Sequence, residues 1–315
     1  MRVDEVRRIA VVGAGVMGHG IAQEFALAGY EVTLVSRSES SLQRGVQGVR
    51  ENLARLAERG MVSADRAESV PDAIYTTTVL EEAAEESDIV VEAVYEELEV
   101  KKRVFRELDK ICPDRTVLAS TTSTLMPSDL ASATQRPDKV LVAHYVNPPY
   151  LVPLVEVVPG KATSEETVNA VRDLLTAVGK RPVVLGQELP GFVSVRLQWA
   201  LLREAMSLVQ RGVVSPQDVD LILRDSLGRR WSAAGVFETL ELAGWDLISA
   251  VASRVVPDLE SSTAVPRLLY EKVERGELGV KTGKGFYDWT PESTEALRRR
   301  ITHALVEVEG WSREP

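Results

Sequence analysis

Residues 8–35, RIAVVGAGVMGHGIAQEFALAGYEVTLV, carry the strongest sequence signal for the fold of the N-terminal half of the chain. Residues 8–12 form a short apolar run, residues 19–29 have a helical pattern, and residues 31–35 form a second apolar run. The glycine-rich turn GAGVMG, residues 13–18, joins the first run to the helix. A GxGxxG turn between a strand and a helix is typical of dinucleotide-binding proteins. The stretch therefore predicts a nucleotide-binding βαβ unit.

The glycine-rich turn has a separate physical role at each of its positions. Gly13 would allow the tight turn, Gly15 would let a pyrophosphate approach the backbone, and Gly18 would let helix and strand pack closely. The phosphates would bind at the helix N-terminus, beside Val16 and Met17, where unpaired N–H groups and the helix dipole favour an anion. A glycine turn can also serve packing alone, but the strands on both sides favour a bound dinucleotide.

Ser36 and Arg37 follow the second apolar run, where an NAD-binding unit usually carries an Asp or Glu for the ribose 2′-hydroxyl. Such a carboxylate would repel a 2′-phosphate, whereas Arg37 could bind one through a charge-assisted contact. We therefore expect the protein to accept NADP as well as NAD. The alternative is that Arg37 points into solvent beside bound NAD.

Apolar runs and helical patterns continue to alternate up to about residue 185. We expect strands at 74–76, 88–93, 116–119, 139–143, 154–158 and 182–185, helices at about 98–109 and 165–178, and an inserted helical hairpin at about 38–70. This alternation predicts an α/β fold with a doubly wound, parallel, Rossmann-like sheet. Ligands bind such a sheet at the C-terminal ends of its strands, where Glu96, residues 120–124 and His144 would lie.

The segment HYVNPPYLVPLVE, residues 144–156, carries a histidine and a carboxylate on either side of a proline-rich bend. Asn147-Pro148-Pro149 cannot continue a central strand, so the chain should turn there. Glu156 lies inside an apolar strand pattern, and a buried carboxylate is costly unless it has a partner. His144 is the obvious partner. The two residues are therefore either an acid–base pair or a structural ion pair in the core.

The turn at Pro190-Gly191 separates this pattern from a helical C-terminal part. We expect a Rossmann-like domain over residues 1–188 and an all-helical domain over residues 189–315. The helices should cover 192–209, 216 to a stop at Gly228, 235–255, 264–275 and 292–308. The first of these helices has apolar residues nearly all round, which predicts that it is buried.

The overall composition argues against several classes of protein. A chain of 315 residues, 44% of them hydrophobic and 27% charged, is expected to fold into two soluble domains. Its net charge of −10, with no basic run, disfavours nucleic-acid and anionic-membrane partners. The sequence shows no bilayer-spanning run and no signal peptide, so we expect a cytoplasmic protein. One Cys and three scattered His give no zinc-ligand spacing, so we expect no metal.

Six motifs in a fixed order resemble those of the 3-hydroxyacyl-CoA dehydrogenase family, and together they span essentially the whole chain. They are GAGVMGHGIAQ, VVEAVYEELEVKKRVF, STTSTL, HYVNPPYLVPLVEV, PGFVSVRL and GVKTGKGFYDW. The resemblance implies a Rossmann-like domain that binds NAD or NADP and an all-helical domain like the C-terminal domain of 6-phosphogluconate dehydrogenase. It further implies a homodimer formed through the helical domain and reversible oxidation of an L-3-hydroxyl group to a 3-oxo group.

The resemblance also assigns roles to individual residues. His144 matches the catalytic histidine, Glu156 the carboxylate that orients it, and Ser123 the serine that binds the substrate hydroxyl. Glu96 and Lys101 match positions beside the nicotinamide and the rest of the cofactor. A neutral imidazole, with an ordinary pKa of about 6.5, can take the hydroxyl proton as hydride leaves the same carbon.

Two departures from the family pattern bear on the substrate. Val195 stands where the family usually has Asn, so either Ser194 or a water molecule supplies the missing hydrogen bond or the substrate hydroxyl is held differently. Pro153 stands where the acyl-CoA enzymes commonly carry Lys. In this respect the chain is similar to the branch that includes L-gulonate 3-dehydrogenase and lambda-crystallin, which handles free 3-hydroxy acids. We also assign Asn147 to the substrate site.

The charge of the inserted hairpin also favours the branch that handles free 3-hydroxy acids. The inserted hairpin balances its arginines with acidic residues and offers no evident clamp for the phosphates of CoA. Arg229 and Arg230 could bind a small carboxylate, although they could equally cap a helix or lie in water. We therefore expect an L-gulonate-like 3-hydroxy acid as substrate. The alternative is an L-3-hydroxyacyl-CoA such as 3-hydroxybutyryl-CoA, in fatty acid metabolism.

A catalytically silent, crystallin-like protein that only binds a dinucleotide is a further alternative. The presence of Ser123, His144 and Glu156 together argues against it.

Overall fold

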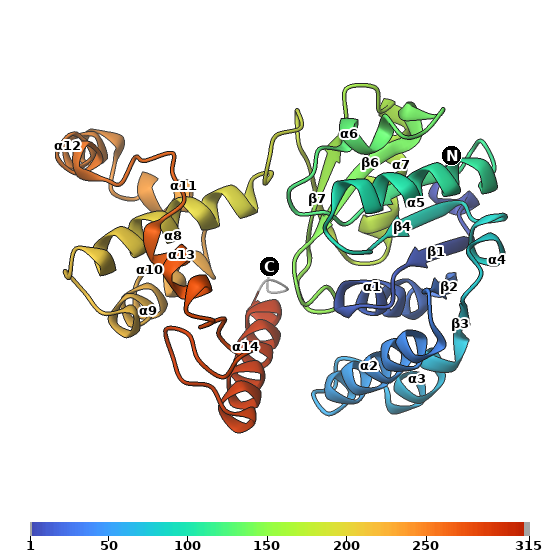
Figure 1. Cartoon of the computed structure of the whole chain (residues 1–315), viewed down its shortest axis with the longest axis horizontal. Coiled ribbons are helices and arrows are strands. Elements are labelled where there is room, and N and C mark those ends of the chain that lie inside the picture. The colour runs from blue at the N-terminus through green and yellow to red at the C-terminus, as the bar shows by residue number, and fades with distance from the viewer. Residues whose placement is uncertain (1, 312–315) are drawn as a thin grey trace. The chain divides into compact units, whose positions relative to one another are not determined.

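The computed structural model of the chain describes residues 2–311, in two compact units that meet in sequence between Val195 and Arg196 (Figure 1). The expected boundary at residue 188 lies shortly before this position. Each unit has its own secondary-structure class: the first is an α/β sheet with helices on both faces, and the second is built almost entirely from helices. The expected fold class is confirmed.

The sheet of the first unit has eight strands in the order β3-β2-β1-β4-β5-β6-β7-β8. The strands are β1 (Arg8–Val12), β2 (Glu31–Val35), β3 (Ile74–Thr77), β4 (Ile89–Glu92), β5 (Val117–Ser120), β6 (Val140–Tyr145), β7 (Leu154–Pro159) and β8 (Arg181–Val184). All neighbouring strands run parallel except β6 and β7. The expectation of a wholly parallel sheet is wrong for this pair. The proline-rich bend between β6 and β7 is too short for the crossover that a parallel pair requires.

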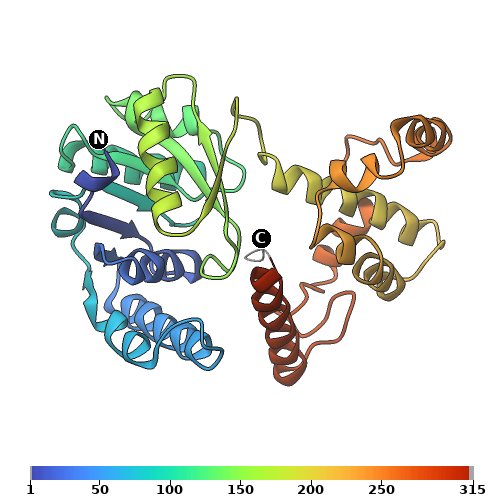
Figure 2. The ribbon, with the colours of Figure 1, turned by 180° about the vertical axis from the view of Figure 1, so that it is seen from behind.

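Helices cover both faces of this sheet. They are α1 (Val16–Leu27), α2 (Glu39–Ala57), α3 (Ala64–Ser69), α4 (Leu80–Ala84), α5 (Leu98–Ile111), α6 (Pro127–Ala131) and α7 (Glu165–Ala177). In Figure 1, α4, α5 and α6 lie on one face, and Figure 2 shows α1 and α7 on the other. Helices α4 and α6 were not predicted, because five residues are too few for a helical period to appear in the sequence.

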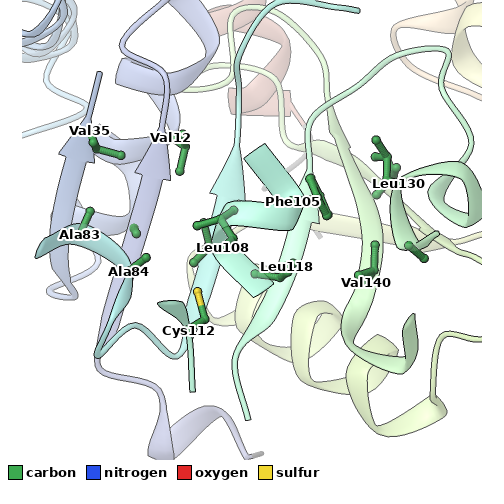
Figure 3. Packing of buried hydrophobic residues seen from close by; sticks show 14 of the residues in the cluster. Val12, Val35, Ala83, Ala84, Phe105, Leu108, Cys112, Leu118, Leu130 and Val140 are labelled. Carbon is green, nitrogen blue, oxygen red and sulfur yellow. The ribbon is translucent and has the colours of Figure 1, made fainter. Parts of the chain in front are cut away.

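Alternation of side chains along the strands gives each face its own core. Figure 3 shows the core under α4, α5 and α6, where Phe105 and Leu108 of α5 pack against strand residues such as Val12, Leu118 and Val140. All five side chains are at least 90% buried. Burial of this kind fixes the strand ends, and therefore fixes the loops that follow them.

The second unit contains α8 (Ser194–Gln210, which begins in the first unit), α9 (Pro216–Asp225), α10 (Leu227–Trp231), α11 (Val236–Glu241), α12 (Trp245–Val255), α13 (Arg267–Glu274) and α14 (Pro291–Trp311). Two expectations about these helices are wrong. Gly228 does not stop a helix but lies inside α10. The helix expected over residues 235–255 is two helices, because Gly244 adopts a φ of 84°, which a helix cannot contain.

The prediction that α8 is buried nearly all round is also wrong for a single chain. Of its residues only Met206 is buried, whereas 66% of Leu197 and 44% of Trp199 are exposed. The other helices of the second unit therefore leave much of this apolar face exposed. Among residues 2–311, no helix combines the length and the apolar character that a membrane crossing requires.

Candidate active site

Several strands of the first unit end side by side at one edge of the sheet. The pairing register places Val12 of β1 beside Glu92 of β4, and Glu92 beside Ser120 of β5. His144 lies near the end of the next parallel strand, β6. The glycine turn, the Glu96 segment, the 120–124 segment and His144 therefore follow neighbouring strands, as the sequence predicts.

The glycine turn is shaped by close packing at two of its positions. Gly13 has a φ of 113°, and a Cβ there would lie 2.5 Å from the carbonyl oxygen of Ala93. A Cβ at Gly18 would lie 1.7 Å from the carbonyl oxygen of Gly13. A Cβ at Gly15, in contrast, would meet no atom of the chain within 4 Å. Gly15 also precedes α1, so this side of the turn fits the pyrophosphate of a dinucleotide against the N–H groups of Val16 and Met17.

Ser36 and Arg37 lie between the end of β2 and the start of α2. The backbone N–H of Ser36 donates to the carbonyl of Thr77 (3.3 Å), and the Arg37 guanidinium lies over the Tyr95 ring, 5.9 Å from its centroid. The Ser38 hydroxyl accepts from the Ser41 N–H as the cap of α2. Stacking on an aromatic ring leaves the edge donors of a guanidinium available to an anion.

Glu96 accepts hydrogen bonds from several residues of the segment that follows β5. Its Oε1 accepts hydrogen bonds from the Thr122 hydroxyl (2.5 Å), the Ser123 N–H (2.9 Å) and the Thr124 hydroxyl (3.1 Å), with a longer contact to the Ser123 hydroxyl (3.4 Å). Burial alone would raise the pKa of Glu96, but these bonds and the charge of Lys101 outweigh it and lower the pKa. Glu96 is therefore ionised at neutral pH, and it orders the segment that carries Ser123.

Lys101 is almost fully buried, and its ammonium is occupied by groups of the protein. It lies 2.7 Å from Glu92 Oε1 and 3.5 Å from Glu96 Oε2, and it also donates to the Val94 carbonyl. Only 1% of Lys101 is exposed. Its predicted contact with the cofactor remains a prediction.

Glu92 was not predicted as a site residue. A carboxylate inside the apolar run DIVVEA is the same signal that drew attention to Glu156, and it could have identified Glu92 as well.

His144 and Glu156 face each other across the antiparallel β6–β7 pair, where they are direct register partners. The distance from His144 Nδ1 to Glu156 Oε2 is 2.8 Å, and both residues are buried, with 6% and 2% exposed. The Phe192 ring packs beside the imidazole, with 5.5 Å between ring centroids. Phe192 was not predicted as a site residue, and it has a positive φ of 47° next to the Pro190-Gly191 turn.

Glu156 is also held by the start of α8. Its Oε1 accepts from the backbone N–H groups of Val193 (3.0 Å) and Ser194 (2.9 Å), and its Oε2 accepts from the Ser194 hydroxyl (2.6 Å). Burial would raise the pKa of Glu156, but the hydrogen bonds from His144, Ser194 and Val193 lower it to about 2. Glu156 is therefore a fixed anion at neutral pH. The Ser194 hydroxyl, which we expected to contact the substrate, donates a hydrogen bond to Glu156.

The remaining predicted residues occupy three different places. Asn147 is exposed in the bend after β6, and Val195 is half-buried in the first turn of α8. Arg229 and Arg230 are exposed on α10 in the second unit. Their substrate contacts remain predictions. Among the described residues, no group of three His, Cys, Asp or Glu side chains could hold a metal ion.

Comparisons with known proteins give a consistent picture. Residues 8–189 match the model of the 3-hydroxyacyl-CoA dehydrogenase NAD binding domain, and residues 191–289 match that of its C-terminal domain. The chain is 32% identical to 5-formyl-3-hydroxy-2-methylpyridine 4-carboxylate 5-dehydrogenase of Mesorhizobium japonicum, over 96% of the chain and 97% of that protein. It is 36% identical to a probable 3-hydroxybutyryl-CoA dehydrogenase of Bacillus subtilis (92% and 100%) and to the lambda-crystallin homolog of Homo sapiens (76% and 76%).

Solved structures agree with these matches. The crystal structure of the pyridine carboxylate dehydrogenase, described as an NAD⁺-dependent dismutase, superimposes with a TM-score of 0.89 at 32% identity, covering 96% of this chain and 97% of that one. The structure of FadB2 from M. tuberculosis gives a TM-score of 0.76 at 32% identity, covering 90% and 99%.

Proposed function

The chain belongs to the 3-hydroxyacyl-CoA dehydrogenase family and is an oxidoreductase with an NAD-binding domain, and we propose that its catalytic base is His144. In this role His144 removes the proton of a 3-hydroxyl group. The observation that supports this most strongly is the 2.8 Å contact between His144 Nδ1 and a Glu156 carboxylate that three further hydrogen bonds hold in place. A histidine fixed by a buried anion is oriented for proton transfer.

The proton positions follow from the charge of Glu156. An ionised carboxylate can only accept hydrogen bonds, so His144 Nδ1 must carry a hydrogen, and in the neutral imidazole Nε2 then presents its lone pair. Nε2 takes the hydroxyl proton, and Glu156 stabilises the imidazolium that forms. Ser123, held by Glu96, binds the substrate oxygen. A bound nicotinamide would supply the acceptor for the hydride of the carbon that carries this oxygen.

For the substrate we propose a small free 3-hydroxy acid, L-gulonate-like. In the inserted hairpin, α2 and α3, three of the five arginines that could bind the phosphates of CoA already contact groups of the protein. Arg50 pairs with Asp72 at 2.6 Å, Arg44 donates to Ser41 at 3.0 Å, and Arg66 donates to the carbonyl of Leu27. A relative that matches nearly the whole chain is named for a free pyridine carboxylate, which supports the same class.

A CoA thioester is the second candidate. The name of the family and the Bacillus subtilis relative, a probable 3-hydroxybutyryl-CoA dehydrogenase matched along its whole length, both favour it. The two candidates differ in charge and size, so one experiment separates them.

Turnover should be measured with paired substrates, each 3-hydroxy acid against its CoA thioester, with NAD and with NADP. We expect kcat/KM for the best free acid to exceed that of its thioester by tenfold or more, because one bidentate carboxylate contact contributes about 1.5–3 kcal/mol. A tenfold preference for the thioester would instead assign acyl-CoA turnover to this site.

We propose that the protein also accepts NADP, through Arg37, whose guanidinium lies over the Tyr95 ring, 5.9 Å from its centroid. The variant Arg37→Glu should raise KM for NADP about 10- to 100-fold and leave KM for NAD nearly unchanged, since only NADP carries a 2′-phosphate. Arg172→Glu, the same charge reversal in an exposed ion pair on α7, is the control and should change neither value. An equal increase in KM for NAD and for NADP in Arg37→Glu would show that Arg37 does not bind the 2′-phosphate. A large preference of the wild-type protein for NAD would show the same.

We further propose a homodimer that covers the apolar stripe of α8. The large exposed side chains of this helix, Leu197, Trp199 and Leu201, support this proposal, because monomeric proteins rarely leave such a stripe in water. The expected cytoplasmic location remains a prediction.

A further inference from the structure

Three charged side chains form a chain of contacts beneath the predicted substrate serine. Glu92 and Lys101 are each 1% exposed and lie 2.7 Å apart, and the Lys101 ammonium lies 3.5 Å from Glu96, whose side chain is 41% exposed. The charges therefore alternate, negative, positive and negative, from the core towards the surface. A buried ammonium is stable only where carboxylates surround it in this way.

Both oxygens of Glu92 are used, and each begins a different route through the structure. Oε1 accepts from Lys101 (2.7 Å) and from the Val94 N–H (2.7 Å). Oε2 accepts from the Ser120 hydroxyl (2.6 Å), and this hydroxyl in turn accepts from the Thr122 N–H (3.2 Å).

The two routes meet again at residues 122–124. The first runs from Glu92 through Lys101 to Glu96, which accepts from the Thr122 hydroxyl and the Ser123 N–H. The second runs through Ser120 to the Thr122 backbone. Glu92 itself lies in the strand register between Val12, which precedes the glycine turn, and Ser120. One buried carboxylate therefore ties the position of the serine segment to the sheet in two ways.

We propose that Glu92 is a positioning residue for Ser123, acting through Lys101 and Glu96 on one side and through Ser120 on the other. The proposal rests on the proposed role of Ser123 in binding the substrate oxygen. Glu92 touches neither substrate nor cofactor in this scheme. Its role is to hold the hydroxyl of Ser123 where Nε2 of His144 can act on the same substrate group, and a misplacement of 1 Å can cost about 100-fold in rate.

The first variant is Glu92→Gln. Glutamine has the same size, but it removes the charge beside Lys101 and turns one acceptor into a donor, so both routes are disturbed. We expect kcat to fall about 10- to 100-fold, with a much smaller change in KM for the cofactor. An uncompensated buried ammonium also destabilises the fold, so this variant alone does not separate positioning from folding.

The double variant Glu92→Gln with Lys101→Met separates positioning from folding when kcat is measured at saturating cofactor and the dissociation constant of the cofactor is measured alongside, because Lys101 is also predicted to lie beside the cofactor. Replacing both members of a buried pair by uncharged side chains of similar size often leaves stability unchanged, so the melting temperature should return towards the wild-type value. The routes to Ser123 remain broken, and kcat should therefore stay 10- to 100-fold low. A kcat that recovers together with the melting temperature would overturn the proposal, because Glu92 would then serve only the stability of the fold.

Hydrogen exchange provides a readout that needs no substrate. The amides of residues 121–124 should exchange about tenfold faster in both variants than in the wild-type protein, relative to the amides of α7. The control is Glu82→Gln, which removes a carboxylate that accepts from the Thr77 hydroxyl at 2.6 Å and lies outside the network. Unchanged exchange in the double variant would overturn the proposal. Should the wild-type protein turn over no acid and no thioester, the proposed function fails, and the exchange result still decides whether Glu92 positions Ser123.

Discussion

Replacing His144 by alanine should lower kcat by about 10²- to 10⁴-fold, the usual contribution of a general base. The imidazole is held in one orientation by Glu156 and packed against Phe192, so no other side chain takes its place. Alanine removes the proton acceptor but leaves the glycine turn, Gly13 to Gly18, unchanged. The dissociation constant of the cofactor should therefore stay within about threefold of the wild-type value.

The control for this variant is His303→Ala, the same replacement on an exposed face of α14 in the second unit. It should leave kcat near the wild-type value. A loss of less than tenfold on replacing His144 would remove this residue as the base.

Replacing Glu156 by glutamine should lower kcat by about 10³- to 10⁴-fold, because it reverses the tautomer of His144. The N–H groups of Val193 and Ser194 need an acceptor, so the amide oxygen should take the place of Oε1. The amide nitrogen then faces His144 Nδ1 and donates to it. His144 would carry its hydrogen on Nε2, where it cannot accept the proton of the substrate.

The same variant tests the charge of Glu156 through stability. Because the folded-state pKa of Glu156 lies at about 2, below its ordinary value of 4.5, its contribution to stability is present above pH 4.5 and is lost as the pH falls towards 2. The contribution is about 3 kcal/mol. The difference in unfolding free energy between wild type and Glu156→Gln should shrink by about this amount between pH 5 and pH 2.

Chemical denaturation at a series of pH values measures this difference, and Glu82→Gln is again a suitable control. A difference that does not change with pH would show that Glu156 is not an ionised, hydrogen-bonded carboxylate in the folded protein. Unchanged kcat in Glu156→Gln would show that the tautomer of His144 does not matter for the reaction.

Much of the first unit could be predicted from the sequence because its signals are local. Apolar runs mark every strand, and the glycine turn marks the first crossover. The direction of β7 could not be derived in the same way. It depends on how short the bend between β6 and β7 is, and a pattern of strand residues carries no direction. Helices α4 and α6 could not be predicted for a different reason: each has only five residues, too few for a helical pattern to appear.

In the candidate site, too, some contacts could be predicted from the sequence and others could not. His144 and Glu156 could be paired from sequence, because a carboxylate in an apolar strand needs a partner, and the structure places them 2.8 Å apart. The donors that hold Glu156 could not be foreseen, since two of them are backbone N–H groups at the start of α8. Backbone donors carry no residue signature. Glu92 has the same sequence signal as Glu156, but its partner Lys101 lies on helix α5 and not on a neighbouring strand, so the strand pattern does not pair the two residues.

In the helical unit, the pattern of α8 predicted burial that a single chain does not provide. A periodic apolar stripe shows that a face avoids water, but it does not say whether the cover comes from the same chain or from another. The helix break at Gly244 could not be predicted from the sequence either, because glycine occurs both within helices and at their ends.

We propose that the His144–Glu156 pair removes the proton of a 3-hydroxyl group while a bound nicotinamide would accept the hydride. The most direct test of this proposal is the absorbance of reduced nicotinamide after wild-type protein and His144→Ala are mixed with NAD or NADP and a panel of 3-hydroxy acids and their CoA thioesters. We expect turnover of at least one substrate by the wild type, and turnover at least 100-fold slower by the His144→Ala variant, which should bind the cofactor equally well. Cofactor binding without turnover of any substrate by the wild type would contradict the proposal, and would show that this protein binds a dinucleotide without oxidising a hydroxyl.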